Sequence, residues 1–527
     1  MYRIDSTKEK PDAKGLLESV AKMMNRGIRV GNVEALYDTC IEIQERWKKD
    51  IKQKYNISNP NSSAQVISYL DSLNDARVVE VCTSNGKWTS NKQVMLELSY
   101  YGYDIGTDIV GYRTAKKYAD SIKSIIDAKD GSNLIHPSVT LTKTNRISYK
   151  EPALMNIPKQ LLWDVVVPYK PGSVLISADI KNQEPSILIN ANRVKSLQPA
   201  LQADIGLYEA MFSKLPITCK LNVVFTDGMT PGVIDNDELR MMDVQPIYYT
   251  PKRAPFSGIH IGSMEGPEIQ LIAVTNLIVP LGTMPVLPDS VVAITEKGEM
   301  LTKASFELDK SAASFKKAMK SGGIVSIEGI LTDVQFECTG VLRKEFKRAW
   351  NAMSYGASKP GVKAMCQHID GEMLYDFFTK IPELKEYRSR CQKLASKGVQ
   401  SINTYFGTEL YAGEPNTKAL RRVLLDLPIQ GTAADILSLL VKHFYEEVDN
   451  RGYEGKLSIY YTRHDELIIE AAKEMVDSIG LENVVNIVRD IVEHQVDDWV
   501  PFRVDIEPVH EVGVSTIIES LDNEDSE

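Results

Sequence analysis

Cysteine and histidine are scarce in this sequence. Six cysteines and seven histidines occur among 527 residues. No C-x-x-C pair is present, and no Cys/His cluster has the spacing of zinc ligands. The sequence therefore predicts neither a disulfide framework nor a structural zinc site.

Long hydrophobic runs are also missing. No stretch approaches the roughly 18 uninterrupted apolar residues of a membrane span. The start, MYRIDSTKEKPDAKG, is too polar for a secretory signal. We therefore expect an intracellular, cytoplasmic protein without membrane contact.

An excess of positive charge is absent too. The chain has 61 Lys and Arg against 71 Asp and Glu, for a net charge of -10. This balance argues against a passive nucleic-acid coat protein, although a nucleic-acid enzyme needs only local phosphate contacts. With 43% apolar residues and this length, we expect three or four domains of about 100 to 200 residues each.

Helical patterns dominate the first part of the chain. Residues 14–55 carry apolar positions three and four apart on either side of a break at Arg26-Gly27, which predicts two helices. More helices are expected up to about residue 130. The last of them carries basic side chains that form either a solvated face or a phosphate-tracking face: Arg113, Lys116, Lys117 and Lys123.

Strand patterns follow in three places. Residues 173–180 alternate in a way that predicts a strand with Asp179 at its end. Gly/Pro-bounded apolar runs between 217 and 332 predict short strands of a separate β-rich insert. After a strong helix over 339–356, two further strands are expected at 456–462 and 467–472, and the chain ends in an acidic tail.

Two sets of polar side chains suggest phosphoryl chemistry. Arg343, Lys347, Asn351 and Tyr355 are spaced by four, so they form one stripe on a helix that advances about 6 Å per step. Two cations on such a stripe could hold successive phosphates, although a surface stripe is the ordinary reading.

The second set is the turn Arg463-His464-Asp465-Glu466 between the last two strands. A hairpin tip would explain it without any function. If Asp465 met Asp179 across neighbouring strands, the two carboxylates would suit Mg²⁺, which binds through one or two carboxylates and substrate phosphates. Two such ions can assist an in-line phosphoryl displacement.

At these residues the sequence resembles the family A DNA polymerases, the class of bacterial DNA polymerase I. Five motifs occur in the family order. They are the segment Thr144–Pro158, similar to T-G-R-L-S…P-N-L-Q-N-I-P; Ser177–Glu184, similar to S-A-D-Y-S-Q-I-E of motif A; Arg343, Lys347, Tyr355 and Gly356, similar to R-x3-K-x7-Y-G of motif B; Arg422 with Leu427–Ile436, similar to P-x-Q-G-T-A-A-D-I; and His464–Glu466, the H-D-E of motif C.

The resemblance implies a template-directed DNA polymerase that extends a primer 3′-hydroxyl with dNTPs on two Mg²⁺ ions. Asp179 and Asp465 would bind the metal ions. Nucleotide contacts would come from Arg343, Lys347, Glu184, Tyr355 and Asn351, with Lys347 also the general acid for pyrophosphate and Glu184 the selector of deoxyribose. DNA contacts would come from Arg146, Arg422, Gln430 and His464.

The resemblance further implies an α/β fold of the right-hand type, with palm, fingers and thumb, and the β-rich insert in the fingers. The expected parts are an N-terminal helical segment (1–57), thumb (58–143), palm (144–203 and 399–515), fingers (204–216 and 333–398), insert (217–332) and acidic tail (516–527). No exonuclease domain is expected. A compact module with a private insert suggests a phage protein acting in its host's cytoplasm.

Several departures keep other functions open. Asn351 stands where the family usually has an aromatic residue, and Asp426 where it often has Asn. Lys347-Arg348 also resembles phage RNA polymerases, so a ribonucleotide-incorporating polymerase or primase is one alternative, and a non-catalytic nucleic-acid-binding scaffold is another. The insert holds ten Lys and Arg against thirteen Asp and Glu. We expect it, or the tail, to bind a protein partner before single-stranded DNA.

Overall fold

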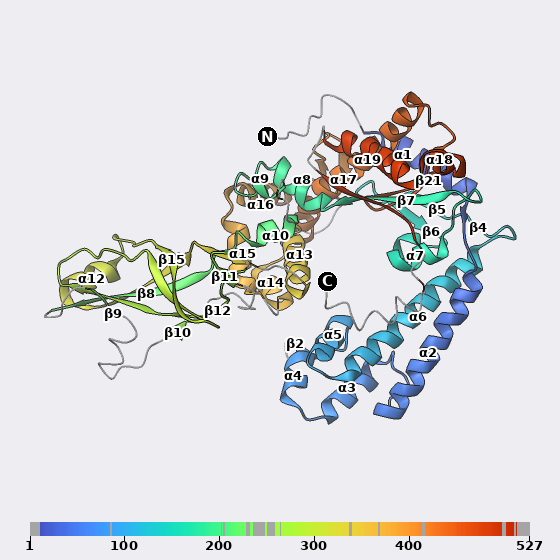
Figure 1. The fold of residues 1–527 in the computed structure, drawn as a ribbon. Coiled ribbons are helices and arrows are strands. Elements are labelled where there is room, and N and C mark those ends of the chain that lie inside the picture. Colours follow the sequence, from blue (N-terminus) through green and yellow to red (C-terminus); the bar gives the residue numbers. More distant parts are fainter. Residues whose placement is uncertain are drawn as a thin grey trace. The chain divides into compact units, whose positions relative to one another are not determined.

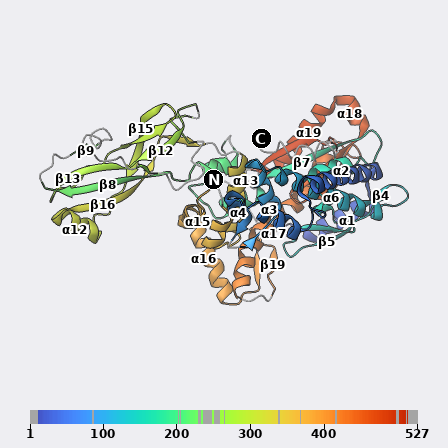
Figure 2. The same cartoon turned by 90° about the horizontal axis from the view of Figure 1, so that it is seen from below.

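A computed structural model describes residues 11–84, 87–201, 203, 206–227, 232–234, 248–249, 259–263, 265–336, 340–366, 369–413, 417–497, 502–510 and 513. The chain forms two compact units, Met1–Val194 with Tyr387–Glu527, and Lys195–Glu386. Figure 1 and Figure 2 show the elements of both. The predicted acidic tail, 516–527, lies outside the described residues.

An antiparallel four-stranded sheet forms the centre of the first unit. Its order is β20 (Leu457–Arg463), β21 (Glu466–Ala471), β7 (Val174–Lys181) and β22 (Arg503–Pro508). Helices α1 (Ala13–Arg26), α17 (Thr417–Asn450) and α19 (Leu481–Asp497) pack against it. Every residue of β21, an inner strand, is buried, whereas the edge strand β22 alternates exposed and buried residues.

A bundle of helices makes up a second part of this unit. The long helices α2 (Val33–Tyr55) and α6 (Asp104–Ala128) run side by side (Figure 1, Figure 2), with α3 (Ser63–Ser72), α4 (Ala76–Cys82) and α5 (Lys92–Tyr100). One hydrophobic core joins Ile51 of α2 to Val66, Met95 and Ile109. This core therefore includes residues on both sides of the predicted boundary at residue 57.

Local sequence signals set where these helices start. The side chains of Asp12, Asn32, Ser62, Asp75 and Asn91 each accept a hydrogen bond from the first turn of the following helix. Such caps satisfy backbone N–H groups that have no partner within the helix. The predicted break at Arg26-Gly27 is confirmed, with Gly27 at φ +93°.

Smaller elements complete the first unit. The short strands are β1 (Ile28–Arg29) with β4 (Leu134–Ile135), β2 (Thr83–Ser84) with β3 (Lys87–Trp88), β5 (Ser138–Leu141) with β6 (Ile147–Lys150), and β18 (Ser401–Asn403) with β19 (Glu409–Tyr411). The short helices are η1 (Leu154–Asn156), α7 (Lys159–Val165), α8 (Gln183–Ala191) and α18 (Lys473–Ile479). The unit boundary falls inside α16 (Pro382–Ser396).

Helix α17 is the one described helix long and apolar enough to span a membrane by length and composition. Of its most apolar window, 83% is buried within the protein, as in the core helix of a folded domain. Pro428 lies inside the helix, and the Thr432 hydroxyl donates to the Pro428 carbonyl at 2.6 Å.

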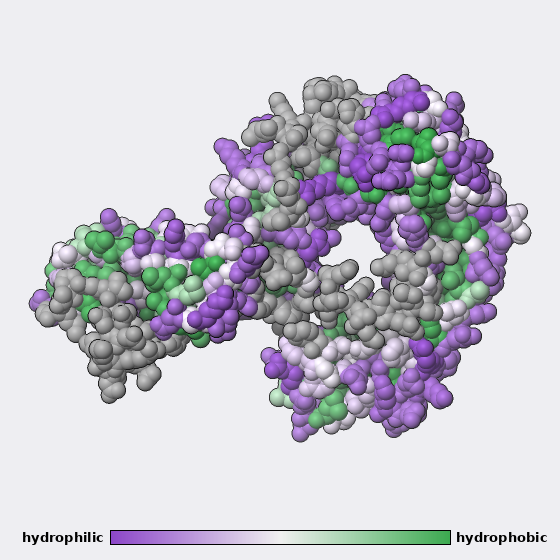
Figure 3. Space-filling view, viewed as in Figure 1, coloured by the Kyte–Doolittle hydropathy of each residue, from purple (hydrophilic) through white to green (hydrophobic). Residues whose placement is uncertain are grey.

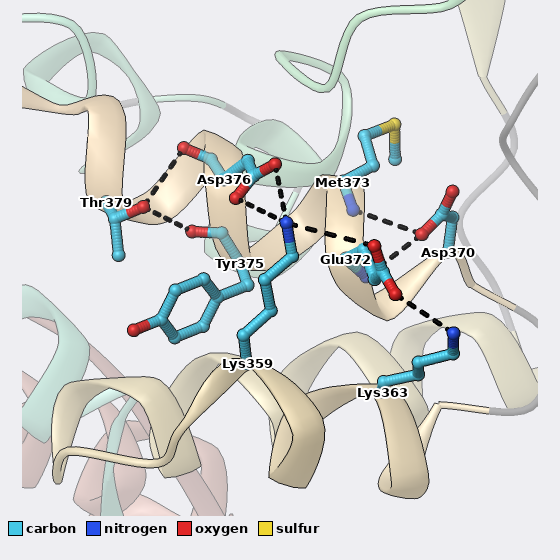
Figure 4. A network of polar contacts seen from close by, with 8 residues as sticks. All are labelled: Lys359, Lys363, Asp370, Glu372, Met373, Tyr375, Asp376 and Thr379. Atoms are coloured by element: carbon cyan, nitrogen blue, oxygen red, sulfur yellow. Dashed lines mark hydrogen bonds and ion pairs between the residues drawn. The ribbon is translucent and has the colours of Figure 1, made fainter.

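The second unit contains a helical part. Its helices are α9 (Gln198–Leu201), α10 (Leu207–Phe212), α13 (Gly340–Ser354), α14 (Lys359–Met365) and α15 (Gly371–Lys380). Figure 4 shows how α14 and α15 are joined: Lys359 contacts Asp376 at 3.0 Å, and Lys363 contacts Glu372 at 2.9 Å. Gly371 is required at this crossing, because a Cβ there would meet the Lys363 Cα at 2.8 Å.

The predicted β-rich insert is an eight-stranded sheet within the second unit. Its order is β10 (Tyr248–Tyr249), β12 (Ile269–Ala273), β14 (Ser290–Thr295), β15 (Gly298–Phe306), β16 (Gly323–Leu331), β8 (Thr218–Thr226), β13 (Thr275–Pro280) and β9 (Gly232–Ile234). Strands β11 (Ile259–Ile261) and β17 (Val334–Phe336) form a separate pair, and α12 (Ala313–Ser321) packs on β8 and β16.

The ends of the insert are bonded together. The Leu331 N–H donates to the Ile217 carbonyl at 2.9 Å, and Ile330 is the register partner of Thr218. The chain therefore leaves the sheet beside the point where it enters.

Candidate active site

A tight turn places Asp465 where strands β20 and β21 of the central sheet meet, in the first unit. Strands β20 and β21 pair up to Arg463 and Glu466, so His464 and Asp465 form the turn. His464 has φ +53°, the left-handed conformation that a two-residue hairpin turn requires. The Ile180 N–H donates to the Asp465 carbonyl at 3.3 Å, which ties the turn to β7.

Asp179 lies on the strand beside this turn. In the pairing of β7 with β21 it is opposite Glu466, the residue that follows Asp465. Burial and the negative charge of Asp179 raise the pKa of Asp465 to about 6. The two carboxylates, 286 residues apart in the chain, therefore lie close enough to repel each other.

A lysine that the sequence did not single out contacts this carboxylate site. The Lys159 ammonium is 3.1 Å from Asp179 Oδ2 and 2.7 Å from Glu466 Oε1. Glu466 is 3% exposed and also accepts from the Ser177 hydroxyl. Burial alone would lower the pKa of Lys159, but the hydrogen bond to Glu466 and the charges of Glu466 and Asp179 outweigh it, and the pKa is raised.

Arg146 and Glu184 form an ion pair near the turn. Arg146 follows the β5–β6 turn, and Glu184 lies in the first turn of α8. Burial and the charge of Glu184 raise the pKa of Asp426 to about 6, while Arg146 acts in the opposite direction. Three acidic and basic groups from distant segments therefore interact here.

Helix α17 presents a polar stripe beside this ion pair. Arg422, Asp426 and Gln430 are spaced by four and so share a face of the helix. Arg422 is exposed and Gln430 half-buried.

Desolvation and the cations Arg463 and Arg146 lower the pKa of His464 in the hairpin turn, which favours its neutral form.

The predicted phosphate stripe lies in the second unit. Arg343, Lys347 and Asn351 are on α13, and Tyr355 is just beyond its last turn, with its N–H donating to the Asn351 carbonyl at 3.1 Å. The helix ends at Ser354 and Gly356 has φ +88°, so the predicted stop is confirmed.

Helix α10 supports three members of this stripe. Glu209 forms an ion pair with Arg343, and the Lys347 ammonium lies 5.6 Å from the centre of the Tyr208 ring. The Tyr208 hydroxyl donates to Asn351 Oδ1 at 3.1 Å. Trp350, next to Asn351, is fully buried against Phe346 and Phe378, so it does not replace the missing exposed aromatic side chain.

A basic cavity of about 450 Å³ lies beside α6 in the first unit. Arg113, Lys116 and Lys117 line it together with Asn61 and Asn156, the last from the Thr144–Pro158 motif. Asp120 also lines the cavity and pairs with Lys116 at 2.9 Å, whereas Lys123 pairs with Asp127 on an exposed part of the same helix. The predicted basic run is therefore divided between a cavity and a solvated face.

Comparison with known proteins identifies the family of this chain. The sequence model of DNA polymerase family A matches residues 32–221 and 330–513, which is more than half of the chain. The chain belongs to this family. The interval between the two matched ranges falls inside the eight-stranded insert, so the family pattern continues on both sides of it.

Individual relatives are distant. The DNA polymerase I of Rhizobium leguminosarum is 24% identical over 216 residues, covering 38% of this chain and 21% of that protein. The DNA polymerase I of Aquifex aeolicus is 32% identical over 104 residues, covering 20% and 17%. The chain thus spans about a fifth of the length of these relatives.

A solved member of the family has the same fold. The POL domain of Pol1 from M. smegmatis, in complex with DNA primer-template and dNTP, matches with a TM-score of 0.57 and 16% identity, covering 94% of this chain and 69% of that one. The predicted α/β polymerase fold is thereby confirmed.

Sequence reasoning missed three side chains that contact predicted residues: Lys159, Tyr208 and Glu209. Lys159 directly follows the family-like Asn156-Ile157-Pro158 segment, and that position was its one available signal. Tyr208 and Glu209 lie in the segment whose resemblance implied an early fingers helix, but that resemblance gave neither side chain a role, and no pattern in the sequence links them to α13.

Proposed function

We propose that this protein is a template-directed DNA polymerase that extends a primer 3′-hydroxyl with deoxynucleoside triphosphates. The observation that carries the proposal is that Asp179 on β7 lies beside the β20–β21 turn that holds Asp465, in a chain of DNA polymerase family A. The M. smegmatis relative, whose complex contains primer-template and dNTP, supports the same substrates.

The carboxylate pair fits magnesium. Asp179 and Asp465 supply hard oxygen donors, and their mutual repulsion would be relieved by a bound cation. Among the described residues, no group of three or more His, Cys, Asp or Glu is arranged to hold a metal. Substrate phosphates and water must therefore complete the coordination, as is usual for Mg²⁺. Two bound ions would supply activation of the primer hydroxyl and stabilisation of the leaving oxygen.

The chain's own residues position the triphosphate. Arg343 and Lys347 on α13 present two cations one turn apart, which suits successive phosphates of a dNTP. Lys347 can also give its proton to pyrophosphate. Asn351 and Tyr355, further along the same stripe, would contact the nucleoside.

Sugar selection is proposed for Glu184. Its carboxylate is held by Arg146, and this ion pair fixes its direction at the start of α8. A carboxylate fixed beside the sugar 2′-carbon would exclude a 2′-hydroxyl. If Glu184→Ala left discrimination between ribo- and deoxynucleotides unchanged in a competition assay, this role would be refuted.

DNA contacts are proposed for the α17 stripe, the hairpin turn and the basic cavity. Arg422 and Gln430 from α17, Arg146 and His464 would read the primer end. Lys116 and Lys117 in the cavity would bind backbone phosphates, because such cations replace the condensed counterions of DNA, whereas Arg113 donates to the Pro60 and Ser90 carbonyls.

A protein partner is proposed for the insert. Leu301 on β15 and Ile324 and Ile330 on β16 are exposed, and their even spacing puts them on one face of the sheet. Figure 3 shows hydrophobic side chains on the insert surface seen in that view. Leu301→Glu combined with Ile324→Glu should leave extension by the purified protein unchanged and reduce co-purification of the partner; equal co-purification would refute the proposal.

The decisive experiment is extension of a labelled primer on a defined template with Mg²⁺, supplying dNTPs and NTPs separately. We expect dNTP-dependent extension that Asp179→Asn and Asp465→Asn each abolish with the fold intact. Asp505→Asn is the matched control, because Asp505 is the other register partner of Asp179 but is neutralised by Lys181 at 2.6 Å.

Other outcomes would select the rival functions. Products from NTPs without a primer would indicate a primase. DNA binding without extension, unaffected by the aspartate substitutions, would indicate a scaffold.

A further inference from the structure

Lys159 is bound to one of the two carboxylates that the proposed function assigns to magnesium. Its ammonium lies 3.1 Å from Asp179 Oδ2 and 2.7 Å from Glu466 Oε1, so it bridges two strands of the sheet. The bridge is not a loose surface contact, since the Lys159 side chain is 31% exposed and its ammonium also lies 5.5 Å from the centre of the Trp163 ring.

Glu466 fixes Lys159 in this place. The Glu466 side chain is 3% exposed, and a buried carboxylate needs a compensating charge or several hydrogen bonds. The Ser177 hydroxyl donates to its Oε1, while Arg463 approaches its Oε2 only to 3.8 Å. Lys159 is therefore the cation in closest contact with Glu466 among the described residues.

A cation at this position has an electrostatic consequence for Asp179. One ammonium already neutralises part of the carboxylate charge, and a divalent ion brought to the same carboxylate would lie within a few ångströms of a like charge. At an effective dielectric constant of about 20, a unit charge and a double charge at about 5 Å repel strongly compared with thermal energy.

We infer that Lys159 is an internal counter-cation that competes with the divalent ion for Asp179 and lowers the affinity of the nucleotide-free protein for that ion. The inference rests on the proposed function, because it takes Asp179 as a metal ligand. A triphosphate brings negative charge that outweighs the ammonium, so the ion is retained when nucleotide is present. Lys159 acts here as a positioning residue and takes no part in bond making.

The test is equilibrium binding of Mn²⁺ to the full chain without DNA or nucleotide, measured from the loss of the free-ion EPR signal. Lys159→Met should tighten binding by about tenfold, because the competing charge is removed. Lys159→Arg, which keeps the charge, should bind Mn²⁺ nearly as the unmodified protein does.

A matched control separates the effect of direct contact with Asp179 from the effect of the change in net charge. Lys181 lies on the same strand as Asp179, two residues away, but its ammonium is engaged by Asp505 at 2.6 Å. Lys181→Met removes the same net charge and should change the Mn²⁺ affinity far less. Equal tightening by Lys181→Met would overturn the inference.

Variants of Glu466 provide the control for a loss of folding. Lys159→Met leaves a buried carboxylate with weaker compensation and should lower the melting temperature of the metal-free protein. If that variant does not fold, Lys159→Met combined with Glu466→Gln is compared with Glu466→Gln alone. The same tightening is expected between those two proteins, and its absence would overturn the inference.

Asp179→Asn distinguishes a failure of the counter-cation role of Lys159 from a failure of the proposed metal site. If Asp179→Asn abolishes Mn²⁺ binding while Lys159→Met leaves it unchanged or weakens it, the counter-cation is refuted and the proposed metal site stands. If Asp179→Asn binds Mn²⁺ as before, the proposed metal site itself is wrong and the inference fails with it.

Discussion

Asp435 allows a quantitative test of how burial couples to stability in this protein. It lies in α17 and is 1% exposed. The hydroxyls of Thr404 and Thr408 donate to its two oxygens at 2.5 Å and 3.0 Å. Burial raises its pKa from 3.8 to about 6, although both hydrogen bonds act in the opposite direction.

The sign of the pH dependence follows from this shift. Between about pH 4 and pH 6 the folded protein binds a proton at Asp435 that the unfolded chain has released. The contribution of Asp435 to stability is therefore complete below pH 4 and is lost as the pH rises through 6. A shift of about two pKa units corresponds to about 3 kcal/mol.

Asp435→Asn removes this titration and keeps the size of the side chain. The free energy of unfolding of the variant, relative to the unmodified protein, should rise by about 3 kcal/mol between pH 4 and pH 8. The measurement is urea unfolding followed by far-UV circular dichroism at both pH values. Asp449→Asn, on an exposed position of the same helix, is the control. A stability difference that is the same at both pH values would refute the reasoning.

Three further outcomes are expected. Because the pKa of Asp465 is raised to about 6, primer extension should fall as the pH drops through 6, and higher Mg²⁺ should move that midpoint to lower pH; a profile insensitive to Mg²⁺ would contradict this. Gly431→Ala should lower the melting temperature, because its Cβ would meet Leu410 Cδ1 at 2.3 Å, whereas Gly361→Ala in α14, whose nearest atom is at 3.4 Å, should not. Tyr208→Phe should raise the KM for dNTP about fivefold by releasing Asn351, with the ring retained beside Lys347; an unchanged KM would exclude a role for this hydrogen bond.

Much of the fold could be predicted because its signals are local. The period-two pattern around Asp179, the apolar runs beside Asp465 and the helix stop at Gly356 each depend on a few neighbouring residues, and all three agree with the structure. The motif order then indicated the family.

What could not be predicted depends on contacts between distant segments. Lys159 meets Glu466 across 307 positions, and Arg343 meets Glu209 across 134. No periodicity links such pairs. The strands of the insert were likewise predicted, but β8 pairs in parallel with β13 and antiparallel with β16, an order that hydrophobic patterns alone do not determine.

The bonded ends of the insert have a consequence for how this chain can be altered. Because Ile217 and Leu331 are joined by a hydrogen bond, a short turn linking the two flanks could replace the whole eight-stranded sheet without separating the segments that it now connects. The insert can thus be removed or exchanged as one unit, because the residues that flank it would keep their positions.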